Sequence, residues 1–437
     1  MTTAHEQQLN DAPSWKTLLI SALPSVAIGV VAALSLWLID EAALLLEHVL
    51  WSSAPDLLGI AADSPWWIIG ILTLTGFAVG IVLWLAPGHG GHDSATVELV
   101  SPVLPIKALP GVVIVIILGL AGGVSLGPES PIIAINTAIA VALIARMSPQ
   151  IPQQLVVLLT ISATVGALFG TPVASALLLT AMFTSAVSTA RLWDRLFLPL
   201  VAAGAGSVTM TFLGGGSLAL TLPPYSPSPL DLATGSVVAI VSAVFAIAGA
   251  WALPRVHGLF RGLRHPVIYV TLGGLVLGVL GALGGPITLF KGLSQMNQLV
   301  VASAGLSVVT LITIAVIKLL ALVVSAGAGF RGGRIFPAIF IGVALGLIGN
   351  AVMPALPLSL AIASGVLGCV FVVSGDGWIS LFVAVAVSGD IATLPILCII
   401  VLPTWLLVRV APEMIVKLKS PGVEPEHDVA PEPEPIR

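Results

Sequence analysis

The sequence predicts an all-α membrane protein that crosses the bilayer many times. Hydrophobic residues make up 57% of the 437-residue chain and charged residues only 8%, and apolar runs of membrane-span length recur throughout. A soluble domain usually carries about 25% charged residues, so most of this surface must face lipid. Backbone polar groups in lipid need internal partners, which favours helices as the spanning elements.

The two ends of the chain are polar. Residues 1–15 lack a basic region before an apolar core, so they do not resemble a cleaved signal peptide. The apolar run from about Leu18 to Leu46 is too long for a signal peptide and fits a retained membrane helix. We expect a cytoplasmic N-terminal segment over 1–15 and a disordered tail over 416–437, which is rich in Pro and Glu. Basic residues just before this tail favour a cytoplasmic C-terminus.

Many of the 45 glycines and 32 prolines lie inside apolar stretches. A broken backbone is tolerated in a bilayer only where protein or a water-filled cavity satisfies its polar groups. The breaks therefore indicate a channel or a transporter rather than a simple anchor. Helices are expected over residues 17–47, 66–86, 109–125, 130–147, 152–169, 172–188, 196–214, 232–253, 267–283, 299–324, 335–352, 356–373, 377–389 and 393–411.

Two Gly- and Pro-broken motifs occupy comparable places in the two parts of the chain. They are GVSLGPESP at 123–131 and GFRGGRIFP at 329–337. Paired interruptions of this kind point to an inverted repeat with a binding site at the membrane midplane. We therefore expect two membrane halves, 16–255 and 256–415.

The first motif has the chemistry of an anion site. Gly127 and Pro128 break one helix, and Pro131 suits the first turn of the next. The backbone N–H groups at such a helix start lack intrahelical partners, and the helix dipole adds positive potential. Glu129 stands there, and an intramembrane carboxylate is a functional candidate by default. It could occupy the anion site and swing out when protonated or displaced. The alternative is a plain N-terminal acid at a membrane interface.

The second motif has similar chemistry. Gly333 permits close backbone approach, and the amides of Ile335 and Phe336 would point at a ligand. Arg331 and Arg334 either attract anions to the entrance or extend to the membrane surface.

A third polar interruption is APGHGGHDSATVE at 86–98, where His92, Asp93 and Ser94 are candidate ligand-facing groups. The alternatives are an ordinary loop and, more weakly, a metal pair of His89 and His92. Lys318, inside an apolar helix, either lines an aqueous path or snorkels or pairs with a carbonyl group.

Several functions are disfavoured. The net charge of −4 comes without a basic stripe, so nucleic-acid binding has no electrostatic basis. Cys369 and Cys398 lie in apolar runs without metal-ligand spacing, and no cofactor site is evident. An intramembrane enzyme would need a Ser/His dyad, yet only His92 approaches a candidate site and no G-x-S-x-G elbow accompanies it.

Three segments together resemble the CLC chloride channel and transporter family, and in particular its bacterial YfeO-like subgroup. LGPESPIIAIN resembles the G-(K/R)-E-G-P motif, with Glu129 at the external gating glutamate and Ser130 at the usual glycine. GGRIFPA resembles G-x-F-x-P, with Ile335 at the usual phenylalanine and Phe336 next to it. GALFGTPVASALL at 166–178 resembles the helix that carries G-x-x-F-x-x-P-x-A.

This resemblance implies two inverted halves of broken and tilted helices, in a homodimer with one pore per subunit. It implies a multi-pass protein of the cell (inner) membrane with both termini in the cytoplasm, in contact with membrane lipid. It also implies transport of small inorganic anions, of the chloride or fluoride class, gated by Glu129. The residues implied to bind anions or line the pore are Gly127, Ser130, Ile335, Phe336 and Gly333, with either His92 or Ser94 in place of the anion-binding serine.

The chain departs from the family pattern at three places. The first motif, G-S-G-I-P, is poorly kept, and ungapped spacing puts His92 at its serine with Ser94 two residues on. The internal proton-transfer glutamate would fall near Met182, and the inner-gate tyrosine near Met414. Neither replacement can carry a proton, which favours a channel-like or weakly proton-coupled mechanism. A secondary transporter for an organic anion on a related scaffold is the alternative.

Overall fold

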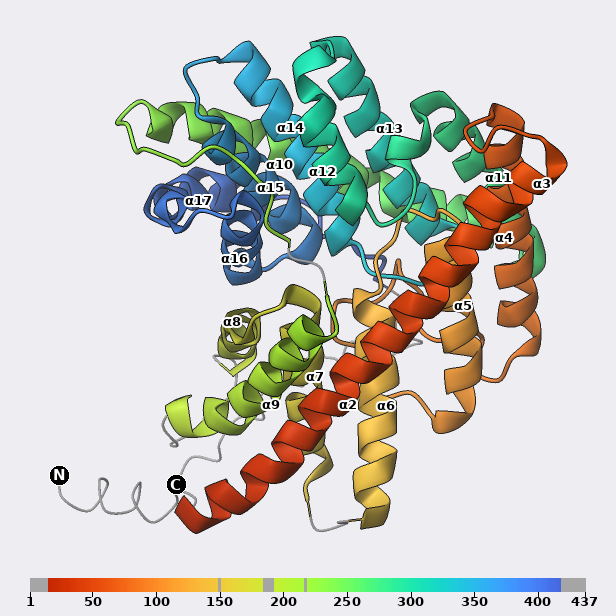
Figure 1. The fold of residues 1–437 in the computed structure, drawn as a ribbon, viewed down its shortest axis with the longest axis vertical. Helices are drawn as coiled ribbons and strands as arrows, with labels where there is room; N and C mark the ends of the chain where they lie inside the picture. The colour runs from red at the N-terminus through yellow and green to blue at the C-terminus, as the bar shows by residue number, and fades with distance from the viewer. Residues whose placement is uncertain (1–14, 148–150, 184–191, 216–217, 418–437) are drawn as a thin grey trace, which may run out of the picture.

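The structure is a computed structural model that describes residues 15–147, 151–183, 192–215 and 218–417. Within these ranges the regular elements are helices, and the one β-type pairing is an isolated antiparallel bridge between Gly127 and Gly333. Figure 1 shows the resulting bundle of helices at many different angles. The all-α fold class is therefore confirmed. The expectations for residues 1–14 and for the tail beyond residue 417 lie outside the described residues.

The helices of the first part of the chain mostly match the apolar runs. They are α2 (Trp15–His48), a π-helical turn (Val49–Ser53), α3 (Ala54–Leu58), α4 (Pro65–Leu85), a 3-10 turn (Ile106–Ala108), α5 (Leu109–Ala121), α6 (Glu129–Met147), α7 (Gln153–Phe169), α8 (Pro172–Phe183) and α9 (Leu192–Phe212).

The described residues of the second part of the chain also form helices joined by short turns. Its elements are α10 (Asp231–Arg261), α11 (Pro266–Gly284), a 3-10 turn (Pro286–Thr288), α12 (Leu293–Ala302), a 3-10 turn (Ser303–Gly305), α13 (Val308–Gly327), α14 (Ile335–Val352), α15 (Leu358–Ser374), α16 (Gly377–Ser388), a 3-10 turn (Ile391–Thr393) and α17 (Leu394–Val408).

Nine of the helices in the described part of the chain are long and apolar enough to cross a membrane. The longest, α2, has 34 residues. At 1.5 Å per residue it is about 50 Å long, whereas the hydrocarbon core is about 30 Å thick, so it can lie in a bilayer only if it is tilted. In Figure 1 α2 crosses the molecule diagonally. Short helices are present as well, such as α8 and α16 with 12 residues each.

Two predicted helices have different limits in the structure. The predicted helix 299–324 is two helices, α12 and α13, because Ser307 caps the start of α13 by accepting a hydrogen bond from the N–H of Thr310 at 3.1 Å. The predicted helix 232–253 continues to Arg261, through Pro254. A proline in a buried helix removes one hydrogen bond, and neighbouring helices can satisfy the freed group. The expected boundary between halves at 255 and 256 therefore lies inside α10.

Glycines bring helices from distant parts of the chain into backbone contact. On α4, Gly76 lies against the carbonyl of Val270, and on α11, Gly274 lies against the carbonyl of Leu72. Helices α14 and α15 meet in the same way through Gly342 and Gly365. Close packing through small residues is typical of membrane helices, whose association has little hydrophobic driving force.

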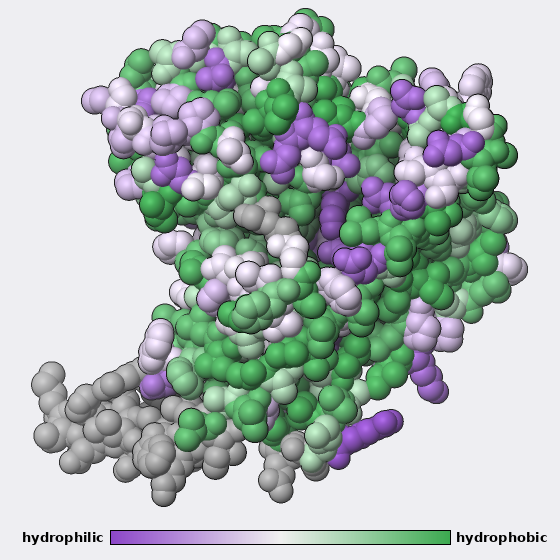
Figure 2. All heavy atoms as spheres, viewed as in Figure 1, coloured by the Kyte–Doolittle hydropathy of each residue, from purple (hydrophilic) through white to green (hydrophobic). Residues whose placement is uncertain are grey.

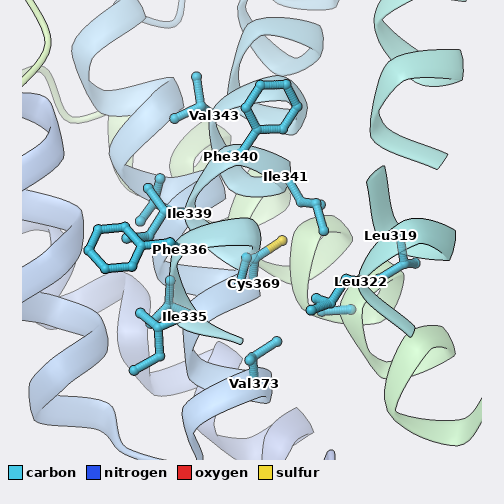
Figure 3. Close-up of a cluster of buried hydrophobic side chains, with 14 of the residues drawn as sticks. Leu319, Leu322, Ile335, Phe336, Ile339, Phe340, Ile341, Val343, Cys369 and Val373 are labelled. Carbon is cyan, nitrogen blue, oxygen red and sulfur yellow. The ribbon is translucent and has the colours of Figure 1, made fainter. Parts of the chain in front are cut away.

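The best-buried helices are α14 and α15. Figure 3 shows Ile335, Phe336 and Ile339 of α14 beside Cys369 and Val373 of α15, in one apolar cluster. Apolar side chains also cover much of the outside, as the green areas of Figure 2 show, and Trp66 and Phe212 are 83% and 86% exposed. Exposed apolar surface on this scale fits contact with lipid.

Candidate anion site

The two broken motifs lie side by side and pair through their backbones. The N–H of Gly127 donates to the carbonyl of Gly333 at 2.8 Å, and the N–H of Gly333 donates to the carbonyl of Gly127 at 2.6 Å. This reciprocal pair joins the segments that precede α6 and α14. The two interrupted segments are therefore adjacent in space, as one shared binding site between them would require.

Both helices begin immediately after this pair. The turns that lead to them contain Gly123 and Gly329, with φ of +90° and +86°, a conformation that only glycine adopts at little cost. Pro131 and Pro337 lie in the first turns of α6 and α14, where their missing N–H groups cost nothing. The free amides and positive dipole ends of the two helices therefore face the same region.

The carboxylate of Glu129 lies at this junction. The residue is 0% exposed, and its Oε1 accepts a hydrogen bond from the N–H of Phe336 at 2.9 Å. Among the described residues, Oε2 has no hydrogen-bond partner. A methyl group built onto Gly127 or Gly333 would overlap this carboxylate, so the two glycines make the space that it fills. The carboxylate thus fills a space that is lined by backbone groups of both motifs.

A cavity of about 430 Å³ opens beside Glu129. Seven of the residues singled out from the sequence line it, namely Glu129, Ser130, Met182, Gly333, Arg334, Ile335 and Met414. Phe336 contributes its N–H to Glu129, while its ring stacks on Phe169 at 6.2 Å between centroids. Segments far apart in sequence therefore form one compartment around the predicted gate.

Arg334 holds one wall of this cavity. Its guanidinium donates to the carbonyl of Val97 at 2.9 Å and to the carbonyl of Met414. The N–H of Val416 also donates to the carbonyl of Ala95 at 2.7 Å, so the segment after α17 runs beside the loop before α5. Arg334 is 9% exposed and Arg331 is 7% exposed. Neither arginine extends to the surface, so the snorkelling interpretation was wrong.

Ser94 and His92 have different surroundings. The hydroxyl of Ser94 donates to the carbonyl of Phe330 at 2.7 Å and accepts from the N–H of Gly332 at 2.8 Å. His92 lies with its Nε2 3.0 Å from the carbonyl of Pro102. Both line a second cavity of about 20 Å³, together with Ser130 and Arg331. Ser94 therefore contacts the second motif directly, and His92 does not share that contact.

Asp93 anchors a charged network that the sequence did not reveal. Its carboxylate pairs with Arg261, with His257 at 3.2 Å and with Arg331 at 3.5 Å. Burial acts to raise the pKa of Asp93, but the hydrogen bond from His257 and the charges of Arg331 and Arg261 outweigh it and hold that pKa well below its ordinary value. Asp93 thus ties the loop to α10 and to the second motif. No group of metal-binding side chains occurs among the described residues.

Lys318 is fully buried in α13. Its ammonium donates to the carbonyls of Thr288, Leu289 and Phe290, at 3.0, 3.0 and 2.7 Å. It also lies 5.1 Å from the centroid of the Phe340 ring. Of the alternatives that the sequence left open, pairing with carbonyl groups is the one observed.

Comparison with known proteins connects this geometry to a family. A family model described as "Voltage gated chloride channel" matches residues 74–409. Similar proteins include two YfeO proteins, whose names refer to ion transport. The one from Shigella boydii (serotype 4, strain Sb227) is 46% identical over 417 residues, covering 95% of this chain and 99% of the relative. The one from Escherichia coli (strain K12 / DH10B) is 45% identical with the same coverage.

Solved structures share the fold at lower sequence identity. A slow cyanobacterial Cl−/H+ antiporter superposes with a TM-score of 0.74 at 16% identity, over 90% of this chain and 96% of that one. A CLC-type fluoride/proton antiporter gives a TM-score of 0.66 at 19% identity, over 91% of this chain and 97% of that one. A eukaryotic CLC transporter gives 0.68 at 15% identity, over 91% and 72%.

Proposed function

The chain belongs to the voltage-gated chloride channel family, and from this we propose that it carries small inorganic anions of the chloride or fluoride class across a membrane. It is a multi-pass membrane protein. The membrane is the cell (inner) membrane, both termini lie in the cytoplasm, and two copies form a homodimer with a separate pathway in each. The names of two neighbours in structure, a Cl−/H+ and a fluoride/proton antiporter, support this class of anion.

One observation supports the proposal above the others, namely the hydrogen bond from the N–H of Phe336 to the buried carboxylate of Glu129. A carboxylate oxygen carries the same sign of charge as a halide and accepts the same donors. When Glu129 leaves, the amide that it occupied is free for a transported anion. Glu129 is thus the gate, and it opens when a proton or a competing anion displaces it.

The remaining site residues follow from the same geometry. The amides of Ile335 and Phe336 and the backbone at Gly127 hold the anion, with Ser130 at the entrance of α6 and Ser94 or His92 at the smaller cavity. Gly333, Met182 and Met414 line the path. Because the site binds and releases an anion without changing it chemically, the protein acts as a transporter or channel and performs no catalysis.

The test is chloride efflux from liposomes that contain the purified protein. Wild type, Glu129→Ala and Glu129→Gln are compared at several pH values, with Asp63→Asn, an exposed acid elsewhere, as the matched control. We expect efflux from the wild type to depend on pH, and efflux from both Glu129 variants to be faster and independent of pH. Unchanged flux and pH dependence in both variants would remove Glu129 from the gate. Inhibition by organic acids but not by halides would favour an organic substrate.

A further inference from the structure

The cavity beside Glu129 contains a second carboxylate, that of Glu98. Glu98 is exposed at the cavity wall, and among the described residues its side chain makes no hydrogen bond or ion pair. Its carbonyl accepts a hydrogen bond from the hydroxyl of Ser130 at 3.4 Å. Because Ser130 follows Glu129 in the chain, this contact places the backbone of Glu98 beside the start of α6.

The other acids on the cavity wall are already engaged. Asp376 caps α16, and its Oδ1 accepts from the N–H groups of Trp378 and Ile379 at 2.8 and 3.0 Å. Glu413 pairs with Lys417 at 2.9 Å. Glu98 differs from these acids, because among the described residues no hydrogen bond or ion pair holds its carboxylate oxygens, and Arg334 and Lys417 act on it only through their charges.

Glu129 supplies the other end of the route. Its Oε2 is buried and lacks a partner among the described residues, and Glu129 lines the same cavity as Glu98. A volume of about 10–15 Å³ holds one water, so the cavity of about 430 Å³ has room for a chain of waters between the two carboxyl groups. The cation on the wall is Arg334, which donates to the carbonyl of Val97 at 2.9 Å, directly before Glu98.

We propose that Glu98 exchanges protons between the solvent and Glu129 through water in this cavity. A proton binds a carboxylate oxygen of Glu98, passes along the waters to Oε2 of Glu129, and neutralises the gate. It leaves from Glu129 when the gate opens to the opposite side and ionises. Only O–H bonds form and break, and one proton is taken up for each one released. Met182 holds no proton, so the loop before α5 supplies the acid that α8 lacks.

This inference rests on the proposed function and deepens it, because it makes the protein a proton-coupled exchanger. The test uses the full chain in liposomes with an imposed chloride gradient, and it records chloride flux and proton movement together. We expect the wild type to move protons against their gradient. We expect Glu98→Gln to keep its chloride flux and to lose proton movement by at least about tenfold, as expected when a positioned proton carrier is removed.

Two further variants make the result specific. Glu98→Asp keeps a carboxyl group and should restore most of the proton movement. Glu413→Gln removes another acid from the same cavity wall and should leave proton movement unchanged. Chloride flux without proton movement in the wild type would overturn the inference, as would proton movement that persists in Glu98→Gln. Loss of both fluxes in a folded Glu98→Gln would also overturn it. Absence of chloride flux in the wild type would instead refute the proposed function.

Discussion

The N–H of Phe336, in the first turn of α14, donates to the carboxylate of Glu129, in the first turn of α6, across an N···O distance of 2.9 Å. A capping acceptor usually comes from the residue just before a helix, but Arg334 in that position makes no side-chain cap. Glu129 takes this role from another helix. Caps contribute about 0.5–2 kcal/mol, a contribution small enough for an anion at the same amide to replace.

Gly333→Ala should displace the gate without removing its carboxyl group. The added methyl would overlap the Glu129 carboxylate, whose flexible end can move away, and the φ of Gly333 is not in the left-handed region. Chloride efflux in this variant should lose its pH dependence, as in Glu129→Gln. The measurement is liposome efflux across a pH series.

The matched control is Gly119→Ala, because a methyl there would meet no atom within 4 Å. Its efflux should follow that of the wild type. If Gly333→Ala retained the full pH dependence, the space beside Gly333 could not be the resting place of the carboxylate.

Ser94→Ala should destabilise the protein. The Ser94 hydroxyl satisfies two buried backbone groups, the carbonyl of Phe330 and the N–H of Gly332. Leaving buried groups without partners costs about 1–3 kcal/mol, so the midpoint of thermal unfolding in detergent should fall. Ser101→Ala, near the same small cavity, is the control and should change little. Equal midpoints for the two variants would show that the Ser94 contacts contribute nothing.

Lys318→Met should be among the more damaging single changes in the membrane region. The substitution keeps an apolar chain of similar size but leaves three carbonyls, at Thr288, Leu289 and Phe290, without their donor. At about 1–3 kcal/mol for each unsatisfied group, the fraction of folded protein after heating should fall sharply. Lys107→Met, at an exposed position, is the control. A heat stability equal to that of the wild type would mean that the carbonyls find other partners.

Asp93→Asn should destabilise the protein in a way that depends on pH. The folded-state pKa of Asp93 lies below its ordinary value of about 3.9, so the stability it contributes is present above about pH 4 and is lost as the pH falls through the folded value. At pH 7 the variant leaves Arg331, which is 7% exposed, without its counter-ion. Breaking a buried pair costs on the order of 3 kcal/mol.

The check for Asp93→Asn is unfolding in detergent from pH 7 downward, with Asp63→Asn alongside. The difference in unfolding midpoint between wild type and Asp93→Asn should narrow below about pH 4, since Asp93 then takes up a proton in the unfolded chain while it stays ionised in the folded one. If the difference in unfolding midpoint stayed constant over the whole pH range, the lower stability of Asp93→Asn would come from altered packing rather than from the lost charge.

Sequence reasoning located the breaks in the helices because glycine and proline mark them directly. Gly127, Pro128 and Gly333 lie at the junction that their pattern predicts. The break between α12 and α13 was missed because the surrounding run is apolar, although Gly305 and the capping serine at 307 were visible signals. Local pattern is therefore a good guide where one residue type imposes the conformation.

Long-range partners could not be predicted in this way. Nothing near Asp93 in the sequence indicates that its partners are Arg261 and His257, which lie more than a hundred residues away. The contact of Arg334 with the carbonyl of Met414 is of the same kind. Such pairings depend on how the helices pack, and a single sequence contains no direct record of packing.

The paired peptide groups of Gly127 and Gly333 have a consequence for speed. They join the segments that precede α6 and α14, so the proposed gate can open without separating the two parts of the protein. In the proposed mechanism the group that moves is the side chain of Glu129, and a side-chain rotation needs no domain hinging, which takes microseconds to milliseconds. A covalent staple across this waist would leave throughput intact.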